Sequence, residues 1–200
     1  MPQLIDYPEV CREADGRGYV SLYPNSGAFG HPAGVATASV GWVGGDDPTL
    51  RPAARPLAVL VPPPAEATLA GLAVRAWRDL LPGGPVWVLP KAHWAYELDF
   101  GSAAWMPDLL RRVGFDPDVL ATRHDGTAAA FAEEEHEAFA VLVEGLLTHL
   151  LGSDFQLIFP GRDAVCTIHH HKQLWWTSAE PNLVVALRET ATRKAVATAG

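Results

Sequence analysis

The chain has 200 residues, of which 48% are hydrophobic and 19% charged, and its formal net charge is −8. This composition is typical of a globular protein with one substantial core. The acidic excess argues against nucleic-acid binding without sequence preference, because Lys and Arg drive that binding by neutralising phosphates. We therefore expect a single globular domain over residues 1–200, with a tail that frays from about residue 189.

Two further features bear on the location of the protein. No segment reaches the roughly 20 uninterrupted apolar residues that cross a bilayer, and the start MPQLIDYPEV lacks the basic and apolar parts of a signal peptide. The two cysteines, Cys11 and Cys166, lack the spacing of a zinc site or a disulfide framework. We therefore expect a cytoplasmic protein with free thiols, no membrane partner and no nucleic-acid partner.

The first part of the chain predicts several short strands. Alternating side chains over residues 19–23, small and β-branched residues over 35–43 and an apolar run over 57–61 are each typical of a strand. A glycine-rich loop over 27–34 separates the first two. It lacks the Lys-Ser/Thr pair of a phosphate-binding loop and no helical pattern follows it, so we interpret it as a surface connection.

The first clear helix is expected over residues 65–80. Apolar residues recur between Leu69 and Leu80 at three- and four-residue spacing, and Pro82-Gly83-Gly84 ends the pattern. A strand-like run over 85–90 follows. Strand, helix and strand then resemble a β-α-β unit, which favours parallel pairing of its two strands through a right-handed crossover.

Residues 91–115 fit two patterns at their start. A helix would place His93 one turn from Glu97, whereas a strand would place Trp94 and Tyr96 on one face. We favour the helix.

Two more helices are expected further along the chain. A short one over 106–113 ends at Gly114, a residue suited to the left-handed cap position. A long one over about 127–151 carries an apolar stripe, and its acidic residues crowd near the start, where the helix dipole favours them. Glu133 and His136 form Glu-x-x-His, a spacing found in di-iron helical bundles. The partner motifs of those bundles are absent, so we interpret this pair as a solvated charged face.

A hairpin is expected over residues 155–176. Turn residues 160–163 join a short strand over 155–159 to a longer one over 164–176. Side chains of a strand alternate between its faces. The more apolar face of the longer strand, which we assign to the core, carries Ala164, Cys166, Ile168, His170, Lys172, Leu174 and Trp176. The other face carries our candidate binding residues: His169, His171, Gln173 and Trp175.

Together these patterns predict an α+β, or mixed α/β, fold. We expect a mixed or largely antiparallel sheet of about five to seven strands. Two main helices, over 65–80 and 127–151, would pack on it, and the hairpin over 155–176 would complete it. An apolar run over 183–187 predicts one more strand.

The pair His169 and His171 is the candidate metal site. On one strand face their Cα atoms would lie about 6.6 Å apart, a suitable separation for two imidazoles on one ion. A divalent metal such as zinc, manganese or iron would need a third protein ligand, and the candidates in the sequence are His31, His93, Glu97, His124 and Asp125. Acid–base chemistry near neutral pH and a partly exposed strand without function are the alternatives. Cys166 lies on the opposite face, so we interpret it as a buried thiol rather than a nucleophile.

Two functions follow from these observations. The one we favour is a non-catalytic binding protein that holds a protein partner or a small ligand with the face of the 164–176 strand and the acidic helix, because no complete catalytic motif is present. The alternative is a metal-dependent hydrolase or related enzyme centred on His169 and His171. Assembly into a homo-oligomer is left open.

Overall fold

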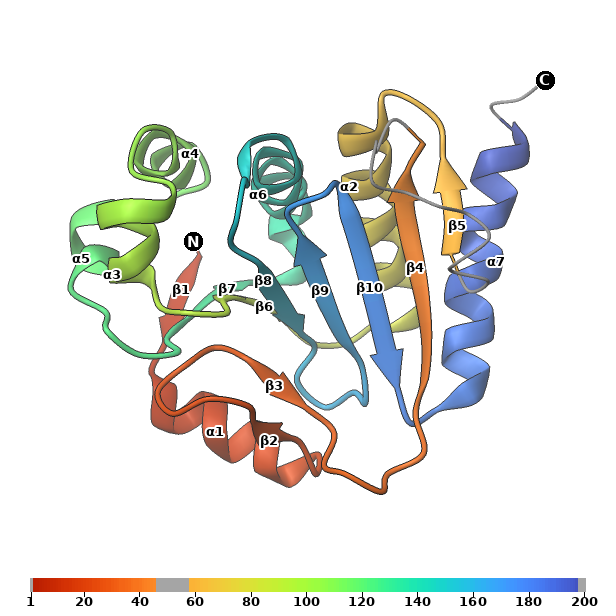
Figure 1. Cartoon of the computed structure of the whole chain (residues 1–200), viewed down its shortest axis with the longest axis horizontal. Coiled ribbons are helices and arrows are strands. Elements are labelled where there is room, and N and C mark those ends of the chain that lie inside the picture. The colour runs from red at the N-terminus through yellow and green to blue at the C-terminus, as the bar shows by residue number, and fades with distance from the viewer. Residues whose placement is uncertain (1, 46–57, 198–200) are drawn as a thin grey trace.

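The computed structural model describes residues 2–45 and 58–197, and its centre is an eight-stranded mixed sheet (Figure 1). The strands are β1 (Gln3–Ile5), β4 (Ala38–Gly44), β5 (Ala58–Val61), β6 (Val86–Pro90), β7 (Ala128–Phe131), β8 (Phe155–Ile158), β9 (Val165–His169) and β10 (Gln173–Ser178). They lie side by side in the order β1-β7-β6-β8-β9-β10-β4-β5. Each neighbouring pair is antiparallel except β4 and β5, which are parallel. A separate small sheet pairs β2 (Val20–Ser21) with β3 (Phe29–Gly30).

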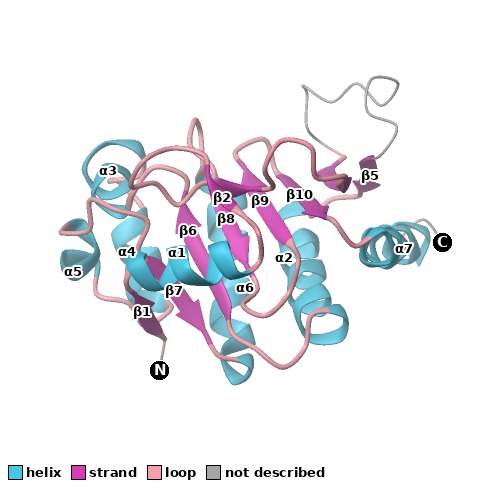
Figure 2. Cartoon of the chain, turned by 90° about the horizontal axis from the view of Figure 1, so that it is seen from below, coloured by secondary structure: helices cyan, strands magenta, loops and turns pink. Residues whose placement is uncertain are grey.

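Helices surround the sheet. They are α1 (Tyr7–Gly16), α2 (Ala65–Arg75), α3 (Trp94–Tyr96), α4 (Met106–Arg112), α5 (Pro117–Ala121), α6 (His136–His149) and α7 (Pro181–Ala197), with the short helical segments η2 (Ala76–Leu80), η3 (Glu97–Gly101) and η4 (Glu133–Glu135). Helix α7 lies beyond β5 at one end of the molecule, and α3 and α5 lie at the other (Figure 2). The expected α+β class is confirmed. The expected count of strands is too low, and more than two helices pack on the sheet.

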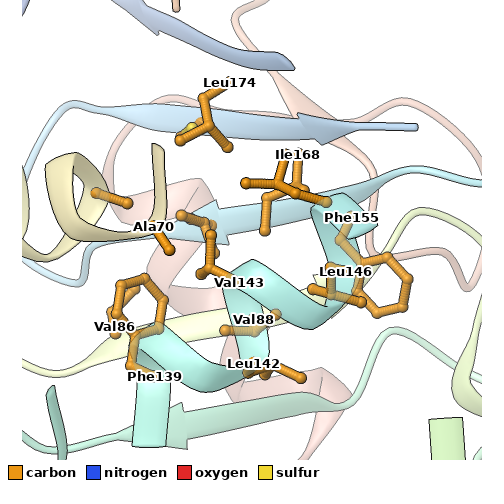
Figure 3. Packing of buried hydrophobic residues seen from close by; sticks show 14 of the residues in the cluster. Ala70, Val86, Val88, Phe139, Leu142, Val143, Leu146, Phe155, Ile168 and Leu174 are labelled. Atoms are coloured by element: carbon orange, nitrogen blue, oxygen red, sulfur yellow. The ribbon is translucent and has the colours of Figure 1, made fainter. Parts of the chain in front are cut away.

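The main core lies between one face of the sheet and the helices α2, α4, α6 and α7. Helix α6 turns Phe139, Leu142, Val143 and Leu146 towards the strands (Figure 3). The face that we assigned to the core is confirmed in part, because Ala164, Cys166, Ile168, Leu174 and Trp176 are buried in this cluster. The prediction is wrong for His170 and Lys172, which are half-buried in the turn between β9 and β10. The helix over 65–80 is confirmed as α2 and η2, and the helical interpretation of His93 to Glu97 as α3 and the start of η3.

The opposite face of the sheet is covered only in part. A second, smaller cluster packs α1 and the small sheet over β6, β7 and β8. The side chain of Gln156 of β8 holds β3 on this face through two hydrogen bonds to Phe29. It accepts one from the backbone N–H of Phe29 (2.8 Å) and donates the other to the backbone carbonyl of Phe29 (2.9 Å). Beyond this cover Trp175 of β10 is half-buried, and its indole lies against Gly41 of β4: an added Cβ there would lie 2.6 Å from the ring.

The helix expected over 127–151 is wrong in its first part. Residues Ala128–Phe131 form β7, and the α-helix begins only at His136. Ala128 and Ala130 are buried in the smaller core cluster while Ala129 and Phe131 are buried in the main one. A strand buried on both faces needs no polar alternation, so pairing with β1 and β6 overrides the helix propensity of alanine.

The expected β-α-β unit is correct in direction and wrong in pairing. Strands β5 and β6 point the same way, since the antiparallel steps between them cancel, but β4, β10, β9 and β8 lie between them. The true parallel neighbour of β5 is β4. The described residues leave out 46–57, between β4 and β5. The first residue of the strand expected over 57–61 therefore lies outside the described residues.

Two expected strands near the C-terminus are also wrong. The strand over 164–176 is two strands, β9 and β10, because the chain reverses at residues 170–172. The segment over 183–187 is part of α7 rather than a strand. Among residues 181–193 of this helix, Val184, Leu187 and Ala191 are buried, and their spacing of three and four is the helical period.

Candidate functional site

The turn between β9 and β10 brings the predicted residues together in an unexpected way. Gln173 pairs directly with His169, so three residues form the loop of the hairpin. The last of them, Lys172, has a φ of 55°. A residue in this left-handed conformation is typical of the end of a three-residue hairpin loop. His169, Gln173 and Trp175 therefore share one face of the sheet, as predicted, whereas His171 lies in the loop and is exposed. Trp175 Nε1 donates a hydrogen bond to Gln173 Oε1 (2.7 Å).

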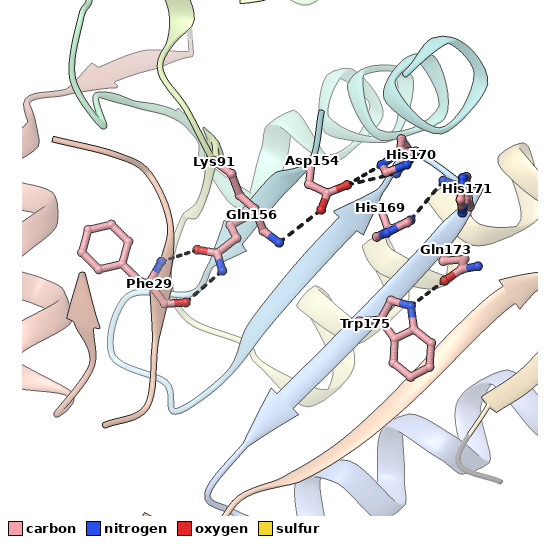
Figure 4. Close-up of polar contacts among 9 residues, drawn as sticks. All are labelled: Phe29, Lys91, Asp154, Gln156, His169, His170, His171, Gln173 and Trp175. Carbon is pink, nitrogen blue, oxygen red and sulfur yellow. Dashed lines mark hydrogen bonds and ion pairs between the residues drawn. The ribbon is translucent and has the colours of Figure 1, made fainter. Parts of the chain in front are cut away.

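Three imidazoles gather at this turn (Figure 4). The ring centroids are 4.2 Å apart for His169 and His170, 4.3 Å for His170 and His171, and 5.0 Å for His169 and His171. One ring nitrogen from each lies within 4.8 Å of the others. Nδ1 of His169 accepts a hydrogen bond from the backbone N–H of His171 (3.2 Å), which holds the turn closed. We call these three residues the histidine turn.

Asp154 anchors the histidine turn from the neighbouring loop. Its Oδ1 accepts hydrogen bonds from Nδ1 (2.9 Å) and the backbone N–H (3.2 Å) of His170, and its Oδ2 lies 3.2 Å from Nζ of Lys91. Burial alone would raise the pKa of Asp154, but the hydrogen bond from His170 and the charges of His169 and Lys91 outweigh it and lower that pKa. A carboxylate that holds Nδ1 of a histidine leaves the lone pair of Nε2 available to a metal.

The electrostatics of His169 follow mainly from its position on the sheet. Burial lowers the pKa of His169, and the charge of Asp154 opposes this shift only in part. The neutral ring is therefore favoured at neutral pH. A neutral imidazole is the form that binds metals.

A cavity of about 680 Å³ lies beside the histidine turn, and Asp154 borders both. Its lining comes from the loop before β3, from the segment between β6 and η3, and from the loops before β7 and β8. The polar and charged side chains of its lining include those of Lys91, His93, Glu97, His124, Ser153 and Asp154.

Glu97 lies in the floor of this cavity and is fully buried. Its Oε2 accepts hydrogen bonds from the hydroxyls of Ser153 (2.9 Å) and Ser102 (3.2 Å). Its Oε1 has no hydrogen-bond partner among the described residues. Burial raises the pKa of Glu97, the two serine hydroxyls oppose this, and the charge of Asp154 adds to it.

None of the third ligands proposed from the sequence reaches the histidine turn. Nε2 of His31 binds Asp163 (2.8 Å) near the small sheet, and Asp125 accepts a hydrogen bond from Thr127 (2.6 Å). His93 and His124 line the cavity, with ring centroids 5.5 Å apart, and Glu97 lies in its floor. The third imidazole is that of His170, which the predicted strand placed on the other face.

Two further predictions concern residues outside the site. His136 bonds the backbone carbonyl of Glu133 through Nδ1 (3.2 Å), and the two do not belong to any metal-ligand group found among the described residues. Cys166 is fully buried, and burial raises the pKa of its thiol well above the usual range, as expected for an inert thiol.

No protein-family model, curated protein or solved structure matches this chain. Its function is therefore inferred from the geometry of its residues. Within residues 2–45 and 58–197, no helix is both long and apolar enough to cross a membrane.

The histidine turn and the acidic start of α6 lie at opposite ends of that helix. Asp154, which contacts His170, follows the C-terminal end of α6, whereas η4 precedes its N-terminal end. The 14 residues of α6 span about 21 Å at the usual helical rise. A single small ligand therefore does not reach from the strand face to the acidic residues, which weakens the combined binding surface expected from the sequence.

Proposed function

We propose that this protein binds a divalent metal ion through His169, His170 and His171. The observation that supports this is the convergence of three imidazole nitrogens within 4.8 Å at one turn. The sequence pattern predicted two of these ligands, His169 and His171. The third, His170, lies beside them because the chain reverses at residues 170–172, where a continuous strand was expected.

The geometry needs only a small closure to hold an ion. Tetrahedral zinc at the usual Zn–N length places its nitrogen ligands about 3.3 Å apart. The imidazoles therefore need to approach one another by about 1.5 Å, which rotation about their side-chain bonds can supply in a turn where His171 is exposed. Three histidines leave one coordination position open for water or a small ligand.

The ligand set discriminates among the three metals expected from the sequence. Manganese favours oxygen ligands, whereas imidazole suits zinc and iron. Zinc also forms more stable complexes than ferrous iron or manganese with a given set of nitrogen ligands. We therefore propose zinc first, with Asp154 orienting His170 as the outer carboxylate. We keep the cytoplasmic location as part of this proposal, since both Cys11 and Cys166 are free thiols.

A zinc titration of the purified, chelator-treated full chain tests the proposal. Calorimetry, or competition with a chromophoric chelator, should give one zinc per chain. The double variant His169→Ala/His171→Ala should lose this binding. Asp154→Asn should weaken it about 10- to 100-fold, because the outer carboxylate no longer orients His170.

His136→Ala provides the matched control, since it removes a histidine from the start of α6, far from the turn. We expect its zinc affinity to equal that of the parent. Equal affinity in the parent and in the double variant would show that zinc binds elsewhere or only adventitiously, and the proposal would be wrong.

A further inference from the structure

The cavity beside the histidine turn holds a serine and a carboxylate in contact, and the metal proposal uses neither. Ser153 lies in the connection between α6 and β8, and its half-buried side chain forms part of the cavity wall. Its hydroxyl donates to Oε2 of the buried Glu97 at 2.9 Å. We propose that Ser153 and Glu97 are a nucleophile and its general base, and that the cavity hydrolyses small carboxylic esters or thioesters.

The base is held by a local irregularity of the chain. Glu97 begins η3, a π-helical segment in which the backbone N–H of Ser102 bonds the carbonyl of Glu97 (2.7 Å). This wider turn brings the hydroxyl of Ser102 to 3.2 Å from Oε2. A nucleophile bonded to a base that a third group orients is the arrangement of activated serines. π-Helical turns are rare and occur frequently at functional sites.

A purely structural role explains Glu97 poorly. A buried carboxylate is normally paired with a cation or hydrogen-bonded at both oxygens. Among the described residues, Glu97 has no ion-pair partner, one oxygen without a hydrogen bond, and the like charge of Asp154 nearby. Its burial therefore costs stability, and a well-packed apolar side chain would fill the same floor more favourably. Burial also raises the pKa of Glu97, which makes it a stronger base than an exposed carboxylate.

The cavity supplies donors for the charge that develops on the substrate oxygen. Nδ1 of His93 accepts a hydrogen bond from the backbone N–H of Tyr96 (3.1 Å), so the neutral ring carries its proton on Nε2 and can donate it. Lys91 and His124 line the same space. These groups also favour an acyl part that is polar. A negatively charged acyl part is disfavoured, because Lys91 is already paired with Asp154 (3.2 Å) and Glu97 lines the same cavity. A volume of about 680 Å³ lies in the range of small-molecule sites.

The reaction balances with water as the only co-reactant. Oγ of Ser153 bonds the carbonyl carbon as its proton passes to Oε2 of Glu97. The bond to the leaving alcohol or thiol then breaks, and the leaving group takes that proton. Water next attacks the acyl-serine and gives a proton to Glu97. The acid departs as Oγ of Ser153 recovers its proton, so ester and water become acid and alcohol.

A fluorophosphonate probe tests this with the intact chain. The probe phosphonylates activated serines and releases fluoride, and intact-mass measurement should show one adduct. Peptide mapping should place it on Ser153 and not on Ser26, which lines the same cavity but donates its hydroxyl to the carbonyl of Tyr23 (2.9 Å). Ser153→Ala should abolish the adduct. Glu97→Gln should slow labelling by about 10²- to 10⁴-fold.

Ser39→Ala is the matched control, because Ser39 lies on β4 and its hydroxyl bonds Thr177 of β10 outside the cavity. It should label as the parent does. Urea denaturation provides the folding control: Ser153→Ala and Glu97→Gln should each unfold in one cooperative transition, as the parent does. Zinc affinity like that of the parent would in addition separate this proposal from the metal site. The absence of an adduct in the parent, an adduct on another residue, or unchanged labelling of folded Glu97→Gln would each overturn it.

Discussion

The buried carboxyl of Glu97 makes a specific prediction about stability and pH. Its pKa is raised above the ordinary value of 4.5 in the folded protein. Below that value Glu97 is protonated in both the folded and the unfolded chain, so its burial adds no pH dependence. As the pH rises further, the unfolded chain loses the proton first. The folded state is then destabilised relative to the unfolded state until the pH passes the folded pKa.

The perturbation that isolates this effect is Glu97→Gln, which keeps the shape and removes the ionisation. We expect the free energy of unfolding of the variant, minus that of the parent, to increase with pH from about 4.5 upward. The slope approaches at most about 1.4 kcal/mol per pH unit, the value for one proton, and becomes flat above the folded pKa. The prediction concerns this slope, because the amide also changes the hydrogen bonds with Ser102 and Ser153 by a constant amount.

Urea denaturation followed by tryptophan fluorescence, repeated between pH 4 and pH 8, measures the difference. Asp99→Asn is the control for the loss of one negative charge, since Asp99 is an exposed carboxylate two residues further along η3. Parallel stability curves for the parent and Glu97→Gln over this range would refute the reasoning. Such a result would mean that water or a rearranged side chain solvates the carboxylate in the folded state.

Two further expectations concern packing and anchoring. Gly145→Ala should destabilise the protein by about 1–3 kcal/mol in urea denaturation, because the new Cβ would lie 2.5 Å from Leu109. Gly71→Ala on α2, where the new Cβ meets nothing within 4 Å, should instead stabilise by about 0.5–1 kcal/mol; effects of the same sign would contradict the close approach of α4 and α6. Gln156→Ala should cost at least about 1 kcal/mol and speed amide hydrogen exchange at Phe29, since it removes both hydrogen bonds of β3 to the sheet. Unchanged exchange at Phe29 would show that the small sheet is held by other contacts.

The elements that the sequence predicts well are those whose side-chain period is decided locally. The helix over 65–80 has an apolar stripe and a Pro-Gly-Gly end. The apolar runs of β5 and β6 are bounded by prolines and glycines. In each case the pattern agrees with the environment that the fold later provides.

The sequence predicts an element wrongly where contacts with residues far away in the sequence determine its structure. Residues Ala128–Phe131 carry a helix-forming sequence, but the segment forms a strand because β1 and β6 pair with its two edges and the two core clusters bury its two faces. The order of β5 and β6 could not be read from their spacing, because four strands separate them: β4 comes earlier in the chain, and β8, β9 and β10 come much later. Helix α1 was not predicted at all, since the stretch after Asp6 is mostly polar and only Val10 and Ala14 are buried.

The candidate site was half predictable. The two-residue pleat period correctly placed His169, Gln173 and Trp175 on one face, and the three-residue loop preserved that relation. The sequence pattern does not indicate the role of His170, because a continuous strand over 164–176 would place its side chain on the opposite face. A strand over 164–176 exceeds the usual limit of about 10 residues, and this length was the available signal for a reversal. The contact between Ser153 and Glu97 joins segments 56 positions apart, and no local pattern indicates it.

The strand order has a consequence for how the chain is made. Strands β8, β9 and β10 fill the middle of the sheet, between β6 and β4, yet they are synthesised last among the strands. A nascent chain that stops before β8 holds two half-sheets with no strand to join them, each with an unpaired edge that invites association with other chains. Closing that gap joins residues far apart in sequence, which favours slow folding. The histidine turn, carried by the last two strands to arrive, can form only when the gap has closed.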